Sequence, residues 1–195
     1  PYLQANIGGA STQVEGNFGS ILGIKSSDAG NFLGQIQAGY SHSCDMFNLS
    51  ASTFYIVGNQ NAGTNTATLS GIGGSVSANQ TFQLKNTWGL SLEPGLNVAE
   101  KTLGYLKFSW FNSDMSYNGN MTVKTTKSLT NSTASASNTV NGAGYGVGLK
   151  HMFGDQLFGA IEYQYVQYSS WSDGNLGTTY KPNQNYGWVG IGYKF

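Results

Sequence analysis

Apolar and polar side chains alternate along several separate stretches of this chain. The final stretch, residues 185–195, reads NYGWVGIGYKF, and its apolar set comprises Val189, Ile191, Tyr193 and Phe195. The opposite set comprises Trp188, Gly190, Gly192 and Lys194. Successive side chains of a β-strand point to opposite faces, so this period of two predicts a strand with one apolar face.

The same period predicts eight strands. Their approximate bounds are 2–10, 31–42, 47–57, 80–92, 102–112, 139–151, 157–169 and 185–195. The connections are rich in Gly, Asn, Ser and Thr, and their lengths run long, short, long, medium, long, short and long. The longest connection, 114–138, cannot bury enough apolar surface to form a core, so we expect a mobile loop. Pro94 should end the fourth strand, because proline lacks a ladder donor.

Charged residues inside the expected strands fall on the polar face. They are Lys85, Lys107, Lys150, Glu162 and Lys194. In the fourth strand this phase puts Phe82, Leu84 and Trp88 on the apolar face, opposite Lys85. A lysine on the lipid-facing side of a barrel costs about 2–4 kcal/mol at the membrane midplane. The phase of the charges therefore favours an apolar face that meets lipid.

Composition excludes several other classes of protein. Charged residues are 9% of the chain, against roughly 25% in an ordinary soluble domain. The net charge is zero and no arginine is present, so the electrostatic footprint of a nucleic-acid-binding protein is missing. No run of about 18 apolar residues occurs, which excludes a membrane-spanning helix. Cys44 is the single cysteine and cannot form an internal disulfide.

Together these patterns predict an all-β fold with one domain, residues 1–195. We expect a transmembrane antiparallel up-and-down β-barrel of eight strands, in which residues 2–10 pair with residues 185–195 to close the sheet. Closure is required because an open edge would leave unpaired backbone groups in hydrocarbon. The alternating connection lengths indicate four long extracellular loops and short periplasmic turns, with both chain ends in the periplasm.

Eight strands, long and short connections in alternation and a terminal aromatic residue resemble the small bacterial outer-membrane barrels of the OmpA, OmpX and Opa type. In that family the last strand is read by the barrel assembly machinery. The resemblance implies an assembly signal at Gly190, Tyr193 and Phe195. It also implies a Gram-negative outer membrane, contact with its lipids and lipopolysaccharide, and a signal peptide removed before Pro1.

The interior of the expected barrel carries opposite charges at one depth. Lys107 and Glu162 each lie about five residues from the short-turn start of their strands and both point inward. An eight-stranded barrel is just wide enough for side chains to fill. We therefore expect the two to meet across the lumen, in a polar network that blocks solute flow. The other expected members are Lys85, Gln35, Gln37, Gln4 and Gln164. In the alternative, internal water hydrates each charge separately.

Catalytic and cofactor sites are not expected. His42 and His151 end two strands, and Ser41 and Ser43 flank His42, but neighbours along a strand point to opposite faces. Alternating glycines at 142–148 lie within a strand rather than in a phosphate-binding loop. They make room for large inward neighbours such as Tyr105 or Trp188. No cofactor and no metal ion is implied.

The function expected from these features is that of a non-enzymatic, monomeric outer-membrane barrel. Its loops would serve adhesion, host-factor binding or envelope integrity, since binding residues tend to lie on loops held by a rigid scaffold. One alternative is a narrow channel for small or hydrophobic solutes. A second is a lipid-modifying outer-membrane enzyme. A third is a soluble ligand-binding barrel with its apolar face inward, which the low charge and terminal Phe195 oppose.

Overall fold

The computed structural model describes all residues except 19–21, 72–73, 126–127 and 174–177. The described strands are β1 (Tyr2–Phe18), β2 (Leu22–Cys44), β3 (Phe47–Val57), β4 (Gln60–Gly71), β5 (Gly74–Ala99), β6 (Thr102–Thr125), β7 (Leu129–Met152), β8 (Leu157–Tyr168), β9 (Trp171–Asp173) and β10 (Thr178–Lys194). No helix in this described part is long and apolar enough to cross a membrane.

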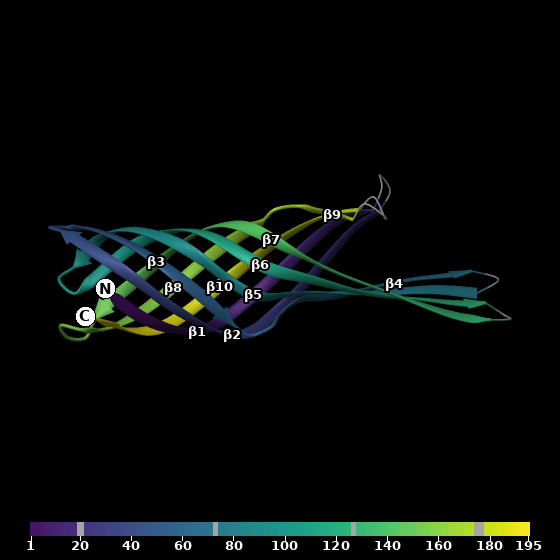
Figure 1. Ribbon diagram of the computed structural model, residues 1–195, viewed down its shortest axis with the longest axis horizontal. Coiled ribbons are helices and arrows are strands. Elements are labelled where there is room, and N and C mark those ends of the chain that lie inside the picture. The colour runs from purple at the N-terminus through teal and green to yellow at the C-terminus, as the bar shows by residue number, and fades with distance from the viewer. Residues whose placement is uncertain (19–21, 72–73, 126–127, 174–177) are drawn as a thin grey trace.

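Eight of these strands close into an antiparallel barrel. The hydrogen-bonded order is β1-β2-β3-β5-β6-β7-β8-β10, and β10 pairs back onto β1 from Tyr2↔Lys194 to Phe18↔Thr178. The predicted closed barrel and the pairing of its first and last strands are therefore confirmed. Both chain ends lie at the end of the short turns (Figure 1), where the Phe195 N–H donates to the Pro1 carbonyl at 3.1 Å.

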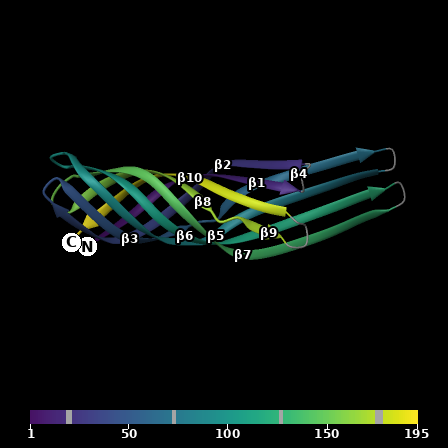
Figure 2. The same ribbon diagram turned by 90° about the horizontal axis from the view of Figure 1, so that it is seen from above.

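The strands run well beyond the bounds predicted from the sequence. At the end opposite the short turns, β4 and β5 continue as one hairpin and β6 and β7 as another (Figures 1 and 2). We call the parts of these four strands in residues 60–84 and 114–141 the projecting sheet. The prediction of a mobile loop over 114–138 is wrong, because β6 and β7 occupy most of it. That prediction considered apolar burial alone, whereas threonine-rich polar strands are held by their backbone ladder.

Strand β5 also passes through Pro94 instead of ending there. Its ladder with β6 has partners at Leu92↔Phe108 and Gly95↔Tyr105 but none at Glu93 and Pro94. The missing proline N–H therefore falls in a gap of that ladder, where it costs no strand pairing. The extension of β5 carries Glu93 into the barrel.

A β-bulge in β5 reverses which side chains face the lumen. Asn86 has a left-handed backbone with φ of 50°, and the register with β6 shifts between Lys85 and Trp88. The extra residue exchanges inward and outward positions along the strand. Phe82 and Leu84 are buried inside, whereas Lys85 is exposed outside. The predicted positions of all three are wrong for this reason.

Below that level the outer wall is a continuous apolar band. Its exposed aliphatic side chains include Leu3, Ile7, Ile36, Leu90, Leu106, Val147, Ile161, Val189 and Ile191. In β3 the alternation of exposed and buried residues persists over 11 residues. A strand that spans a membrane needs about 9–11 residues, so the band has the height that a bilayer requires.

Candidate functional site

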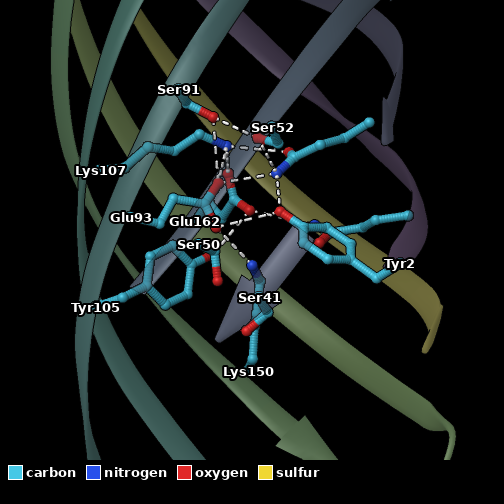
Figure 3. A network of polar contacts seen from close by, with 12 residues as sticks. Tyr2, Ser41, Ser50, Ser52, Ser91, Glu93, Tyr105, Lys107, Lys150 and Glu162 are labelled. Carbon is cyan, nitrogen blue, oxygen red and sulfur yellow. Dashed lines mark hydrogen bonds and ion pairs between the residues drawn. The ribbon is translucent and has the colours of Figure 1, made fainter. Parts of the chain in front are cut away.

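Four charged side chains meet inside the barrel near the short-turn end (Figure 3). We call Glu93, Lys107, Lys150 and Glu162 the charge cluster. One comes from each of β5, β6, β7 and β8, and each is at least nine-tenths buried. The charges of the two ammonium groups and the two carboxylates sum to zero. This balance matters because an uncompensated charge in such surroundings costs several kcal/mol.

The cluster is a row of alternating charges. Lys107 Nζ lies 2.6 Å from Glu162 Oε2 and 3.4 Å from Glu93 Oε1. Lys150 Nζ lies 2.6 Å from Glu93 Oε2. Lys107 is thus shared between two carboxylates, and Glu93 between two ammonium groups. The row links four consecutive strands of the barrel, β5 to β8, through side chains inside the lumen.

Neutral side chains supply the remaining hydrogen bonds of the cluster. Tyr105 donates its hydroxyl to Glu162 Oε1 at 2.7 Å, and Gln37 donates its amide to Glu93 Oε1 at 2.8 Å. Lys107 in turn donates to Gln37 Oε1 at 3.1 Å. The Lys150 ammonium lies 4.6 Å from the ring centre of Tyr105 and 4.8 Å from that of Tyr2. Cation–π contact of this kind compensates an ammonium withdrawn from water.

Six of the seven residues expected in the network are buried in the lumen. Lys107, Glu162 and Gln37 contact one another or share a partner in the cluster, as described above. Gln4 donates to Glu162 Oε1 at 3.1 Å, and Asn6 donates to Gln35 Oε1 at 2.6 Å, one layer farther along the lumen. Gln164 bonds Ser109 at 2.7 Å. Lys85 lies outside the barrel and takes no part.

Sequence reasoning missed half of the cluster. Lys150 had a usable signal, because it shares the polar phase of its strand with the inward glycines. Glu93 had none, because Pro94 beside it marked the end of the strand. Tyr105 is expected inside the barrel as a large neighbour of the glycines, but its hydrogen bond to Glu162 was not predicted.

An apolar layer fills the lumen beyond the charge cluster. Its buried members include Leu33, Phe54, Ile56, Phe82, Leu84, Phe111, Met115, Val140, Val166, Tyr186 and Trp188. Tyr186 stacks between Phe111 and Trp188, with ring centres 5.9 and 5.5 Å apart. We expected a polar plug, and an interior that turns apolar halfway along was not predicted.

Glycines on inward positions make room for these large side chains. A Cβ at Gly148 would overlap the Tyr105 ring, and one at Gly144 would meet Phe111 at 2.8 Å. Space for Trp188 comes from another strand, because a Cβ at Gly8 would meet its ring at 2.7 Å. The expectation that the glycines accommodate large inward neighbours holds for Tyr105 in this geometry.

A second polar layer closes the other end of the apolar layer. Gln184 donates to Thr12 at 2.7 Å and to Gln60 at 2.8 Å, and Tyr186 donates to Gln60 at 2.7 Å. Tyr168 donates to Gln184 at 3.0 Å. Packed side chains therefore occupy the lumen at successive depths. A cavity of about 140 Å³ opens at the short-turn mouth and is bounded by Tyr2, Lys150 and Phe158.

The sequence matches the outer membrane protein beta-barrel domain family over residues 1–195. The chain belongs to this family. Solved structures with a similar arrangement include the attachment invasion locus protein Ail of Yersinia pestis, with 12% identity and a TM-score of 0.49. That alignment covers 100% of this chain and 98% of Ail.

Two other solved structures resemble this chain to a similar extent. Neisserial surface protein A shares 16% identity, with a TM-score of 0.48 and coverage of 100% of this chain and 96% of that one. The outer membrane protease OmpT of Escherichia coli shares 9% identity, with a TM-score of 0.47 and coverage of 100% and 97%. Comparison with the sequences of curated proteins gave no match.

The outer-membrane barrel carries its two histidines on the outer wall. His42 and His151 are both exposed there, and His151 Nδ1 lies 2.9 Å from Thr102 Oγ1. Ser41 instead bonds Asn48 at the inner wall, so it is not brought to His42. Within the described residues, no group of three or more His, Cys, Asp and Glu side chains could hold a metal ion.

The final strand of the outer-membrane barrel places its aromatic residues outward. Tyr193 and Phe195 are exposed on the wall with ring centres 5.1 Å apart. Gly190 faces the lumen, where a Cβ would overlap the Asn6 side chain. Glycine is thus required there by packing, whatever further role the position has.

Removing one ammonium group from the charge cluster should destabilise the barrel. Lys107→Met leaves Glu162 buried without its ion pair, and we expect a loss of about 3–5 kcal/mol in the free energy of unfolding. The double variant, Lys107→Met with Glu162→Gln, leaves Glu93 and Lys150 as a pair with no net charge. Much of the lost stability should therefore be recovered. Urea unfolding of the refolded protein in lipid vesicles measures both.

Lys101→Met is the matched control, since Lys101 is exposed in the turn between β5 and β6. It should change the free energy by no more than about 0.5 kcal/mol. Equal losses for Lys107→Met and the double variant would mean that the loss does not come from leaving the Glu162 carboxylate unpaired.

Proposed function

We propose that this protein is a non-enzymatic, non-conducting outer-membrane barrel that holds the projecting sheet outside the cell to bind a protein partner. One observation carries the proposal. The lumen is packed with side chains at successive depths, whereas four strands continue far beyond it (Figure 2). A wall built only to conduct would need no such extension.

The projecting sheet has an edge suited to strand addition. In β7, the part from Leu129 to Asn141 pairs with β6, and pairing with β8 begins only at Gly142↔Tyr168. Its other side therefore has no strand partner among the described residues. Unpaired N–H and C=O groups on an edge are a template for an extended segment of another chain.

The chemistry of this edge favours pairing. Residues 128–141 contain no charge and no proline, the two devices by which proteins usually blunt an exposed edge. Asn131, Thr133 and Ser135 are exposed. The partner we infer is an extracellular polypeptide with an extended segment, bound mainly through its backbone.

Shortening the projecting sheet should abolish binding without unfolding the barrel. In cells that display the protein, we expect replacement of residues 116–137 by a two-residue Asn-Gly turn to reduce retention on immobilised extracellular-matrix and serum proteins by about tenfold or more. Heat-modifiable gel migration checks that the barrel still folds. Retention equal to that of the parent protein would rule out the sheet as the binding surface.

Matched lysines test the edge itself within the same experiment. Thr133 lies on the edge strand, and Asn120 is its Cα partner on β6, one strand inward. Thr133→Lys should weaken retention because a charge on the edge hinders strand addition. Asn120→Lys adds the same charge at the same level and should have a smaller effect.

The alternative function, a narrow channel, is opposed by the packed lumen. A solute would have to displace the charge cluster and the apolar layer in turn. We therefore expect no stable conductance in planar-bilayer recordings of the reconstituted protein. A reproducible open conductance would overturn the non-conducting part of the proposal and leave the binding part to the display experiment.

We also propose that the short-turn end lies in the periplasm, that the barrel is a monomer surrounded by outer-membrane lipid and lipopolysaccharide, and that its last strand is the signal for the assembly machinery. The exposed pair of Tyr193 and Phe195 supports this, because side chains on the wall remain accessible until the barrel closes. Deletion of Phe195 should lower the amount of folded protein in the outer membrane several-fold.

The control for this deletion is Phe47→Ala, which removes another exposed aromatic side chain at the same end of the barrel. Folded protein is quantified by gel migration in isolated outer membranes. If both changes lower its amount equally, the loss reflects an aromatic contact with lipid and not a terminal signal.

A further inference from the structure

A polar patch lies on the outer wall where the apolar band ends. Its side chains border a surface depression of about 500 Å³. We call this the outer-wall patch, and its outward members are Lys85, Asn86, Asp114, Ser116, Ser137 and Thr139. These residues come from β5, β6 and β7 and form no part of the lumen.

The bulge at Asn86 creates the patch. Without it, the period of two would put Lys85 into the lumen and Leu84 on the wall. With it, the Lys85 ammonium faces outward and makes no ion pair or hydrogen bond with the part of the chain that the structure describes. A free lysine at this depth is available to a ligand outside the barrel.

Asp114 lies beside Lys85 and is held in place. The two are Cα partners across β5 and β6, which puts their backbones about 5 Å apart. Asp114 Oδ2 accepts from Asn86 at 2.9 Å and Oδ1 from Thr139 at 3.2 Å. The patch thus presents one fixed carboxylate and one free ammonium, with no net charge.

A tryptophan pair fixes the depth of the patch. Trp88 and Trp110 lie on the wall just inside it, with ring centres 5.3 Å apart. Indole side chains gather at the membrane interface, where their apolar rings and polar N–H groups are both accommodated. Lys85 lies about 7 Å farther along β5 than Trp88, allowing for the bulge. That is the level of lipid headgroups.

We propose that the outer-wall patch binds the headgroup of a zwitterionic, amine-bearing phospholipid or glycolipid of the phosphoethanolamine class. Lys85 pairs with the phosphate, and Asp114 pairs with the amine, which a two-carbon linker separates from it. A purely anionic headgroup would gain Lys85 but would be repelled by Asp114. The inference rests on membership of the outer-membrane family and not on the proposed binding of a protein partner.

Lipid titrations of the full chain, followed by native mass spectrometry from detergent micelles, test this assignment. Phosphatidylethanolamine should bind about two- to fivefold better than phosphatidylglycerol with the same acyl chains, which is the range of exposed ion pairs. Lys85→Gln should weaken the binding of both lipids. Asp114→Asn should weaken the binding of phosphatidylethanolamine and strengthen the binding of phosphatidylglycerol, which reverses the preference.

Lys101→Gln, at the opposite end of the barrel, is the control for loss of one positive charge and should leave the preference intact. Gel migration confirms that each variant is folded. The proposal is overturned if Lys85→Gln behaves like the control, or if Asp114→Asn weakens both lipids alike, because a general disturbance of the wall would produce that result.

Discussion

The structure depends on one constraint, which is that a closed sheet of eight strands has to fill its own interior. Closure pairs β1 with β10 and leaves no edge within the band that meets lipid. It also directs every second side chain into a lumen that is only wide enough for side chains. Whatever stands at those positions must pack or pair, because little room remains for water to solvate it.

The charge cluster and the glycines of β7 satisfy that constraint in two different ways. Glu93, Lys107, Lys150 and Glu162 neutralise one another across the lumen, at separations of 2.6 to 3.4 Å. The inward glycines of β7 leave room for large rings from the neighbouring strands β6 and β8. Charge and space are both needed, and β7 supplies some of each, since a long lysine side chain reaches a carboxylate only if nothing stands between them.

The sequence predicts the barrel well within the apolar band, because lipid on one side imposes a strict period of two. It therefore predicted the strand pairing, the outward face of β10 and the inward direction of Lys107 and Glu162. It failed where lipid no longer acts. Above the band, both faces of a strand can be polar, as in residues 114–138, and the period disappears although the backbone ladder continues. The bulge at Asn86 is a backbone event, and the one mark it leaves in the pattern is a polar residue in the apolar phase of the strand.

The reversal at that bulge matches a change of surroundings along β5, from lipid below it to water above it. Below it, the wall is apolar and the lumen polar, as lipid requires. Above it, Phe82 and Leu84 turn inward while Lys85 turns outward, which is the arrangement of a water-soluble sheet. If the period were unbroken, the outer face of β5 would expose apolar residues to water above this level or lysine to lipid below it. One extra residue removes the conflict, so the bulge lies where β5 leaves the membrane and begins to support the projecting sheet.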